Sequence, residues 1–486
     1  MSWADVYPWT APETGRPVIR QVYDQVRSAI HAGALKPGGR LPSSRDLAIR
    51  LGVARASVVA AYDQLLAEGY AEGRTGSGTY VSDDLSGVLD LKAPKPAPEP
   101  AVTPVLPARA FDLADVPTTL APPSEPQTFS NGRTLMDARA LDAWSTSTRR
   151  ALRTLGPQHF GYSEPAGDPR LRAAVADYLR AARGVVCEPS QVIITSGAQH
   201  AVDLAARLLL KPGDKVWLED PGYPQTWQAL QAAEAEAMAV PVDRAGLVVQ
   251  AGVQAAPDAR AAFVTPSHQF PLGVAMSMGR RLELVAWARA AGAWIVEDDY
   301  ASEFRYEGAP LASLQGLDGG ERVIYVGTFN KSLFPGIRLG YVVAPRALVQ
   351  PLSALRRLTD RQPPTLTQSI TLDFLESGQF AAHIRRRRLA YKAQRDALAE
   401  ALTRRLGHML EVDVPDQGMH LIAYLKDGFS DREVQARAEA KGLQARAISP
   451  LFHDAPPRQG LLLGFTGFPA KSMDAGVARL AAALSA

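Results

Sequence analysis

The sequence predicts an α/β protein with two unequal parts. These are a small N-terminal head of helices and one hairpin, and a large body built on a mostly parallel sheet covered by helices, with a smaller α+β C-terminal subdomain. Three observations predict this organisation. Within residues 1–82, apolar residues first recur at helical spacing and then alternate. Residues 83–110 are rich in proline and alanine. Beyond them, apolar strand-like runs alternate with helical segments, which is typical of a parallel sheet with both faces covered.

Composition and length place the chain among ordinary globular proteins. Its 486 residues, 46% hydrophobic and 21% charged, suit two or three domains with a large core. The net charge of +3 is too small to indicate a partner. The single cysteine, Cys187, cannot form an internal disulfide, and it follows a surface turn with no paired histidine, so we expect it to be inert. No apolar run suits a membrane helix and no signal peptide is visible, so we expect a cytoplasmic protein.

The head is predicted to contain three helices and a hairpin. One face of the first helix carries Ile19, Val22, Tyr23, Val26 and Ile30. Ser43 or Ser44 caps the second helix and Gly52 ends it. The third helix carries Val58, Val59, Tyr62, Leu65 and Leu66. Residues 69–81 alternate around Gly76-Ser77-Gly78, which predicts a hairpin, and the whole indicates a winged helix-turn-helix.

This arrangement favours DNA binding. The second helix of a helix-turn-helix lies in the major groove, where its first residues meet bases and phosphates. We therefore expect contacts from Ser44, Arg45, Arg55 and Ser57, and from Arg74 and Gly76 in the wing. Residues 16–82 hold nine Arg and Lys against five Asp and Glu, which is the right sign for phosphate. Charge alone leaves open a small helical domain that contacts protein.

The boundary between the two parts is predicted at residues 83–110. The segment Lys92–Pro100 offers little to bury, and its prolines favour extended conformations, so we interpret it as an exposed, semi-stiff linker. The alternative is a ligand for a proline-binding module. The predicted domains are therefore residues 1–82, the linker 83–110 and residues 111–486.

The body is predicted to carry buried strands separated by helices. Examples are Gln191–Thr195, Lys215–Leu218, Ala261–Val264, Ala293–Val296 and Arg322–Val326. From about residue 380, long helices and a few strands indicate the smaller subdomain.

Four features of the body point to pyridoxal phosphate. A lysine amine forms an imine with an aldehyde, and Lys331 is the candidate. Asp298 can hold the pyridine nitrogen protonated and Tyr300 can meet the ring hydroxyl, since both follow one strand and project from the same side. Residues 195–199 open a helix and offer backbone N–H groups to a phosphate, with Arg338 nearby. Taken singly, these would read as a surface lysine, a capping aspartate and a core tyrosine, but their order and spacing favour the coenzyme.

The head resembles the winged helix of the GntR superfamily over residues 18–82. The matching motifs are Ile30-x-x-Gly33-x-Leu35-x-Pro37-Gly38-x-Arg40-Leu41-Pro42-Ser43-Ser44-Arg45-x-Leu47-Ala48 and Glu68-Gly69-Tyr70…Arg74-x-Gly76-Ser77-Gly78-Thr79-Tyr80-Val81. One departure is Ala54, where that family usually has serine; Ala54 cannot cap the recognition helix or donate to phosphate.

The body resembles fold-type I aminotransferases, and the whole chain is similar to the MocR-like regulators. The motifs that carry this likeness are Glu219-Asp220-Pro221-Gly222-Tyr223, Pro266-Ser267-His268-Gln269-Phe270-Pro271-Leu272-Gly273, Glu297–Tyr306 and Gly327–Tyr341. The resemblance implies an internal aldimine at Lys331. It also implies a coenzyme pocket formed by Asp298, Tyr300, Tyr223, Ala198, Gln199, Thr328, Arg338 and His268, with Tyr162 from the other subunit of a head-to-tail homodimer.

Several departures bear on activity. Asn330 replaces a common serine but still forms hydrogen bonds. True amino-acid aminotransferases carry a carboxylate-binding arginine on a late strand, and Leu461–Gly467 offers none. Gln225 is neutral where some such regulators have arginine, and Arg446 remains a possible anion ligand. The run Arg385–Arg388 is interpreted as a solvated helix face, with DNA contact as the alternative.

The sequence therefore predicts a regulator rather than an enzyme. Pyridoxal phosphate, or its imine with an amine or amino-acid effector, is expected to change how the dimer holds double-stranded operator DNA. The alternative is an active aminotransferase that its head tethers to DNA. A scaffold that has lost the coenzyme is disfavoured by the intact set of Lys331, Asp298 and Tyr300.

Overall fold

The computed structural model describes residues 7–13, 15–74, 77–85, 127–308, 311–426 and 428–485, and it divides into two compact units. The first unit is Met1–Phe111 and the second is Asp112–Ala486. Most of the expected linker, from residue 86 on, lies outside the described residues. The exact domain boundaries stay a prediction.

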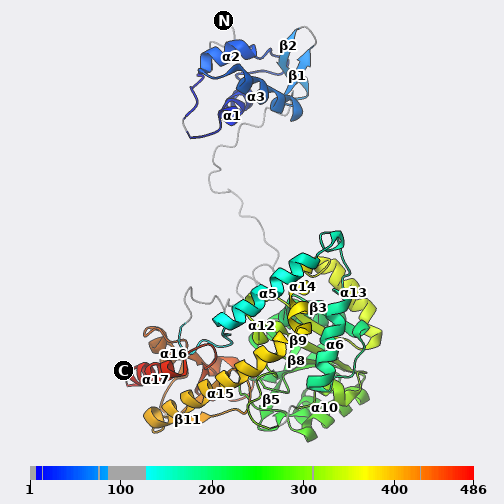
Figure 1. Cartoon of the computed structure of the whole chain (residues 1–486), viewed down its shortest axis with the longest axis vertical. Helices are drawn as coiled ribbons and strands as arrows, with labels where there is room; N and C mark the ends of the chain where they lie inside the picture. Colours follow the sequence, from blue (N-terminus) through cyan, green and yellow to red (C-terminus); the bar gives the residue numbers. More distant parts are fainter. Residues whose placement is uncertain are drawn as a thin grey trace. The chain divides into compact units, whose positions relative to one another are not determined.

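The head has the predicted three helices and hairpin (Figure 1). Ser43 caps α2 by accepting the Asp46 N–H at 3.1 Å, and Gly52 ends it in the left-handed conformation, as expected. The core is formed by one face of each helix, but three residues expected on those faces are exposed instead: Ile19 (43%), Val59 (39%) and Leu66 (36%). The elements are α1 (Val18–His31), α2 (Ser44–Leu51), α3 (Arg55–Ala67), β1 (Ala71–Arg74), β2 (Gly78–Val81) and η2 (Asp83–Leu85).

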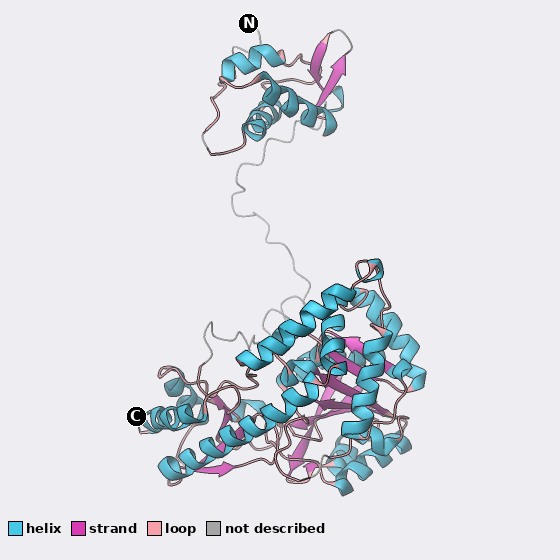
Figure 2. Cartoon of the chain, in the orientation of Figure 1, coloured by secondary structure: helices cyan, strands magenta, loops and turns pink. Residues whose placement is uncertain are grey.

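The body is built on an eight-stranded sheet surrounded by helices, which confirms the predicted fold class (Figure 2). Its order is β3-β10-β9-β8-β7-β4-β5-β6. Six strands run the same way, whereas β10 and β6 run antiparallel to their neighbours. The strands are β3 (Val192–Thr195), β4 (Lys215–Asp220), β5 (Glu236–Asp243), β6 (Gly246–Leu247), β7 (Ala261–Val264), β8 (Trp294–Asp299), β9 (Val323–Thr328) and β10 (Gly340–Val343).

Helices connect the strands and cover the sheet. They are α5 (Ala138–Thr154), α6 (Pro169–Arg183), α7 (Ala198–Leu209), α8 (Pro224–Ala232), α9 (Val249–Ala255), α10 (Met278–Ala291), α11 (Leu314–Asp318), α12 (Phe329–Ser332), α13 (Arg346–Asp360) and α14 (Thr365–Glu376). One face of β3, β10 and β9 packs against helices through a cluster of buried apolar side chains that includes Ile193, Val342 and Val326.

A smaller subdomain follows, as the change of pattern near residue 380 predicted. The long helix α15 (Gln379–Leu406) leads into a four-stranded antiparallel sheet in the order β11-β12-β14-β13, and α15 packs against α17. The other elements are β11 (Leu410–Asp413), β12 (His420–Leu425), α16 (Asp431–Glu439), β13 (Arg446–Ala447), β14 (Gly460–Gly464) and α17 (Ala470–Leu484).

Candidate coenzyme pocket and nucleic-acid face

The pocket lies at the carboxyl ends of β8 and β9, where parallel strands place ligands. Asp298 is the second-last residue of β8, and Tyr300 is the first residue after the strand. Thr328 ends β9 and caps α12, because its hydroxyl accepts the Asn330 N–H at 3.1 Å. This cap starts the short helix that carries Lys331. Strand pairing thus brings a lysine and an aspartate 33 positions apart in sequence to one edge of the sheet.

Lys331 is enclosed by a loop that the sequence did not single out. A Cβ added to Gly132 would collide with the Lys331 Nζ, and the backbone at Gly132 has φ +68°. Glycine is therefore required where this loop crosses the lysine. Burial lowers the pKa of Lys331, and the charge of Asp298 opposes that effect. Burial therefore favours the neutral amine, which is the form that acts as a nucleophile.

Asp298 and Tyr300 carry polar atoms without a partner. Both Asp298 Oδ1 and the Tyr300 hydroxyl are buried and lack a hydrogen bond. Burial, with the charges of Asp299 and Glu219, raises the pKa of Asp298 to about 7, while Lys331 opposes the shift. Buried polar groups are normally satisfied, so these two indicate an absent partner. A protonated pyridine nitrogen and a ring hydroxyl would fit them.

The carboxylates on either side of Asp298 serve the structure instead. Asp299 accepts from Arg183 Nε at 2.8 Å and from Ser302 at 2.8 Å. Glu297 accepts the backbone N–H groups of Leu314 and Gln315 at 2.9 and 3.0 Å. Because side chains alternate along a strand, these two point away from the face that carries Asp298. Of the three consecutive acidic residues, Glu297 and Asp299 therefore have structural roles, and Asp298 is available to a ligand.

The predicted phosphate cup gathers at the start of α7. Gly197 precedes the helix with φ +99°, so Ala198 and Gln199 begin it with backbone N–H groups available to an anion. A Cβ on Gly197 would lie 2.8 Å from Asn330 Nδ2 and 3.9 Å from an Arg338 terminal nitrogen. The structure thus brings together the predicted phosphate ligands from β3–α7 and from the segment after Lys331.

Aromatic and imidazole side chains line the rest of the pocket. Tyr223 occupies the N-cap position of α8 without a side-chain cap hydrogen bond, and it meets Phe270 edge-on at 5.1 Å between ring centroids. His268 is buried 6.0 Å from the Tyr300 ring and 4.9 Å from His420, and a Cβ on Gly418 would collide with it. Burial lowers the pKa of His420 to about 4, so this histidine is neutral, and its Nε2 lies 2.9 Å from the Pro271 carbonyl. Sequence reasoning missed His420; the only available signal was its place two residues after a glycine.

Tyr162 does not join the pocket of its own chain. Its side chain is 78% exposed, and the Arg361 guanidinium lies 3.6 Å from its ring centroid. An exposed aromatic suits the predicted role across a dimer, which stays a prediction. Arg446 lies in β13 at the edge of the small sheet.

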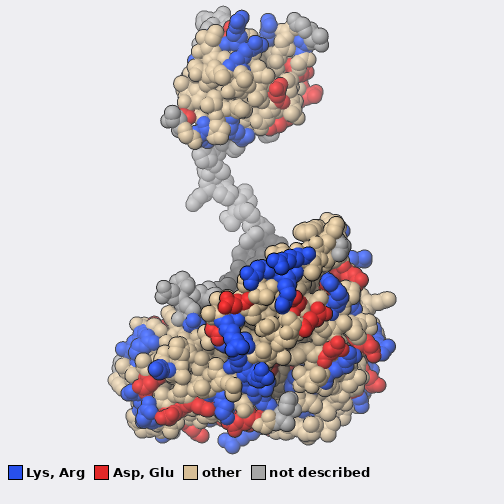
Figure 3. All heavy atoms as spheres, viewed as in Figure 1, with Lys and Arg blue, Asp and Glu red and all other residues tan. Residues whose placement is uncertain are grey.

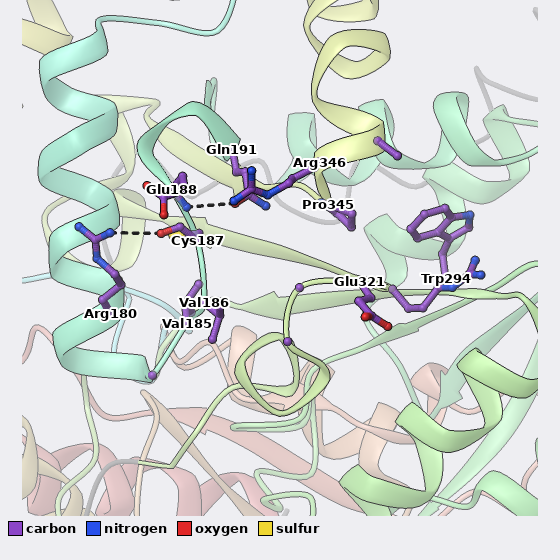
Figure 4. Close-up of a pocket in the computed structure, with 15 residues that line it drawn as sticks. Arg180, Val185, Val186, Cys187, Glu188, Gln191, Trp294, Glu321, Pro345 and Arg346 are labelled. Atoms are coloured by element: carbon purple, nitrogen blue, oxygen red, sulfur yellow. Dashed lines mark hydrogen bonds between the residues drawn. The ribbon is translucent and has the colours of Figure 1, made fainter.

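A second hollow in the body is unrelated to this pocket (Figure 4). It has a volume of about 930 Å³ and is lined by Arg180, Cys187, Trp294, Arg322 and Arg346, among others. Trp294 begins β8 and Arg322 precedes β9, so the hollow opens at the amino ends of these strands. Lys331 follows the opposite end of β9, on the order of 20 Å away along a six-residue strand.

The DNA-binding candidates in the head lie on two adjoining helix starts. Ser44 and Arg45 begin α2, and Arg55 and Ser57 lie in the first turn of α3. Arg45 and Arg55 are exposed, and Arg55 Nε donates to Ser44 Oγ at 3.1 Å. Figure 3 shows Lys and Arg gathered at the edge of the head that carries α2. Exposed cations thus lie at the start of the second helix of the motif, where we expect the contacts with DNA.

The wing is a weaker candidate than the helices. Arg74 already donates to Glu72 at 2.7 Å and to Asp83 at 3.0 Å, and its guanidinium lies over the Tyr80 ring. A DNA phosphate would have to compete with these two carboxylates. Gly76 lies outside the described residues.

Two further expectations meet the structure here. Ala54 occupies the N-cap of α3 and makes no side-chain cap hydrogen bond, as its side chain requires. The interpretation of Arg385–Arg388 as a solvated face was wrong in part. Arg387 is 3% exposed and pairs with Asp137, and Arg388 donates to the Glu303 carbonyl at 2.9 Å, so these two hold α15 to the body.

Comparison with known proteins agrees with this geometry. The family "Bacterial regulatory proteins, gntR family" matches residues 18–81, and "Aminotransferase class I and II" matches residues 129–445. The "Probable rhizopine catabolism regulatory protein MocR" of Rhizobium meliloti is 40% identical, covering 97% of this chain and 94% of that protein. The "HTH-type pyridoxine biosynthesis transcriptional regulator PdxR" of Corynebacterium glutamicum is 34% identical over 93% of each chain.

A solved structure matches the body. A kynurenine aminotransferase from Pyrococcus horikoshii, in complex with PMP and its substrates and products, has a TM-score of 0.70 and 26% identity, covering 82% of this chain and 98% of that one. Fold and site thus define a GntR-type head joined to an aminotransferase-type body. The chain belongs to the MocR-like regulators, as its sequence motifs predicted. Within the described residues, no helix is both long and apolar enough to cross a membrane.

Proposed function

We propose that the chain is a transcription regulator that binds double-stranded operator DNA through its head and pyridoxal phosphate through Lys331. The observation that carries the coenzyme assignment is the pair of orphaned polar atoms, Asp298 Oδ1 and the Tyr300 hydroxyl, beside a buried lysine. Buried polar atoms normally have a hydrogen-bond partner, so a ligand that supplies a partner to each of these two atoms supports the assignment. The aminotransferase family and the PMP-bound relative support the same cofactor.

Each pocket residue has a separate task. Lys331 links covalently to the cofactor, whose aldehyde condenses reversibly with amines when bound. Asp298 holds a proton on the pyridine nitrogen, and Tyr300 donates to the ring hydroxyl. Tyr223 covers the ring face, and His268 lines its edge. Ala198, Gln199, Thr328 and Arg338 surround the phosphate, to which Tyr162 of a second copy adds a hydroxyl.

Regulation requires that the ligand discriminate between two arrangements of the protein. A ligand shifts DNA binding only by its differential affinity for those arrangements, and operator must then shift ligand affinity reciprocally. We infer that the cofactor, or an amine that displaces Lys331 from it, is that ligand. A homodimer would present two heads to a two-fold operator.

The test of the cofactor assignment is direct. Full-length protein is incubated with pyridoxal phosphate, reduced with borohydride, digested and analysed by mass spectrometry. We expect a pyridoxyl group on Lys331 in the wild type and on no peptide of Lys331→Ala. Lys392→Ala, which removes a lysine at the surface, is the control and should keep the pyridoxyl group on Lys331. An unlabelled Lys331 in reduced wild type would remove the assignment.

An active aminotransferase is the second candidate, because the set of Lys331, Asp298 and Tyr300 is complete. It is disfavoured because the late strand β14 carries Leu461, Leu462 and Leu463 and no arginine. Repeated turnover of amino donors with a 2-oxo acid acceptor would favour the enzyme. Consumption of no more than one donor per site would favour the regulator.

A further inference from the structure

One face of α15 carries several buried nitrogen atoms that lack a hydrogen-bond partner within the described residues. His383, Arg386 and Arg387 lie three and four positions apart, so their side chains share that face. The unpartnered atoms are both ring nitrogens of His383, Nε and Nη2 of Arg386, and Nε of Arg387. Buried polar atoms are normally satisfied, so this concentration of nitrogen atoms indicates a missing acceptor.

Asp137 supplies negative charge to this face, but its carboxylate is already engaged. It caps α5 by accepting the Ala140 N–H at 2.9 Å, and it pairs with Arg387. Within the described parts of the chain, no carboxylate lies within 4.0 Å of the Arg386 guanidinium. Arg386 therefore has buried N–H groups and no counter-charge in contact with them.

Positive charge at this face is desolvated and uncompensated. Burial lowers the pKa of Arg386, and the charge of Arg139 lowers it further, whereas the charge of Asp137 opposes the shift. Burial, with the charges of Arg387 and Arg386, lowers the pKa of His383 to about 4, so this imidazole is neutral. Guanidinium groups stay protonated in proteins, so the cluster favours the binding of an anion.

The two unpartnered atoms of Arg386 form one edge of its guanidinium. Nε and Nη2 can donate side by side to two oxygens of a single oxyanion. Elsewhere in this chain a carboxylate occupies that edge. Arg150 donates to Asp373, and Arg405 donates to Asp474, in each case through Nε and Nη2 at 2.6 to 3.1 Å. The same edge of Arg386 is buried and has no such partner in the described residues.

The cluster borders two segments that enclose Lys331. The backbone of Ser332, the next residue in α12, acts on His383 and opposes the fall in its pKa. The ion pair to α15 also holds Asp137, five positions beyond Gly132, whose backbone lies against the Lys331 Nζ. An anion at the cluster would therefore stabilise the arrangement of both segments around the lysine.

We propose that Arg386, together with His383 and Arg139, binds a small oxyanion, either a phosphate or a carboxylate, at a site separate from the coenzyme pocket. Two oxygens of the anion accept from the paired edge of Arg386, and a ring N–H of His383 donates to the same anion. Arg139 is exposed and attracts the anion from solvent. A halide offers no pair of oxygens to this edge and should bind more weakly. The inference goes beyond the proposed function and does not depend on it.

The test measures anion binding to full-length protein saturated with pyridoxal phosphate, which occupies the phosphate cup of the coenzyme pocket. Potassium phosphate, sulfate, acetate and chloride are compared at one ionic strength by their effect on the unfolding temperature, and phosphate affinity is measured by calorimetry. Phosphate and sulfate also stabilise proteins through exclusion from the surface, so the result is the difference between wild type and variant.

We expect phosphate or acetate to raise the unfolding temperature, relative to chloride, by more in wild type than in Arg386→Gln. The phosphate or acetate affinity of Arg386→Gln should be lower by about tenfold or more, because two charge-assisted hydrogen bonds are lost. A preference for phosphate and sulfate would identify a phosphate ligand, and a preference for acetate would identify a carboxylate.

Three further variants make the result specific. Arg385→Gln removes an exposed neighbour in the same helix and should respond as wild type. Arg386→Lys keeps the charge without the paired edge and should bind with intermediate affinity, which also serves if Arg386→Gln does not fold. The proposal is overturned if wild type and the Arg386 variants respond equally, if Arg385→Gln loses as much affinity, or if no oxyanion binds more tightly than chloride. It is also overturned if Arg338→Gln loses phosphate binding that Arg386→Gln retains, because the anion would then lie in the phosphate cup.

Discussion

The head and the body handle charge in opposite ways. On the head, Arg45 and Arg55 are exposed and lie at helix starts, where water satisfies them until a polyanion replaces it. In the body pocket, Asp298 and Tyr300 are buried with unsatisfied atoms, and Lys331 is held close to Asp298. An exposed cation hardly changes the stability of the free protein. A buried polar atom without a hydrogen-bond partner destabilises the protein until a ligand supplies that partner.

The difference indicates two kinds of recognition. The head is suited to a ligand that binds through many weak, salt-sensitive contacts. The body is suited to one small ligand that satisfies several buried groups at once. Substitutions in the pocket should therefore have large effects on one ligand, and those on the head smaller effects on another.

The largest effect is expected at Asp298. Asp298→Ala leaves the pyridine nitrogen without its buried counter-charge, and loss of one partner of such a pair costs roughly 3–5 kcal/mol. The affinity for the cofactor should fall at least a hundredfold. The absorbance of cofactor retained after dialysis measures this loss. Glu219→Gln is the control, because the Glu219 carboxyl is buried nearby but already accepts from Thr265 and Gln269. Equal cofactor affinity in both variants would show that Asp298 has no special role.

A smaller effect is expected on the head. Arg55→Ala should weaken operator binding by about 1–3 kcal/mol if Arg55 makes a bidentate base contact. Arg74→Ala should cost less, because Arg74 is already engaged by Glu72 and Asp83. Titrations of labelled operator at several salt concentrations measure both, and neither variant should change the cofactor spectrum. If Arg74→Ala lost more operator affinity than Arg55→Ala, the wing rather than α3 would make the base contacts.

The pH dependence of the cofactor-free protein sharpens the contrast. Because burial raises the pKa of Asp298 to about 7, the folded state binds a proton that the unfolded state has released between about pH 4 and 7. Stability should therefore fall as pH rises through this window. Asp298→Asn should make the slope shallower by up to about 1.4 kcal/mol per pH unit. If the free energy of unfolding changed with pH equally in variant and wild type from pH 4.5 to 7.5, the raised pKa of Asp298 would be contradicted.

The smallest effect is expected at the cap of α3. Ala54→Ser should stabilise the head by about 1 kcal/mol, since its hydroxyl can accept a free N–H of the first turn. Hydrogen exchange of the α3 amides in the full chain measures this gain. Ala56→Ser lies inside the helix, cannot cap it and serves as the control. No added protection in Ala54→Ser would show that the α3 terminus is already satisfied.

Local features explain why so much was predictable from the sequence. Ser43 begins α2 through its side chain, and Gly52 ends it through its backbone conformation. The strands β7 and β8 are recognised from their own apolar runs, without any distant residue. Lys331, Asp298 and Tyr300 follow such runs, and parallel pairing then places them together. The family resemblance added assignments that spacing alone did not give.

The missed features depend on contacts between distant segments. Gly132 meets Lys331 across 199 positions, and no periodicity near Gly132 indicates that contact. The pairing of Arg446 with Leu462 depends on strand register, in which a shift of one residue would turn the side chain to the other face. Arg387 was mistaken for a surface residue because a run of four arginines conceals its ion pair with Asp137.

The central claim is that the ligand state of the body changes DNA binding by the head. It is tested most directly by titrating labelled operator DNA with cofactor-free and cofactor-loaded full-length protein at one salt concentration, with and without a primary amine that can condense with the cofactor, and by measuring the bend angle of the bound DNA. The account predicts that affinity or bend angle differs between at least two of these states, and that operator shifts cofactor affinity by the same factor as cofactor shifts operator affinity. Superimposable titrations and identical bend angles in every state would contradict it and leave two independent domains on one chain.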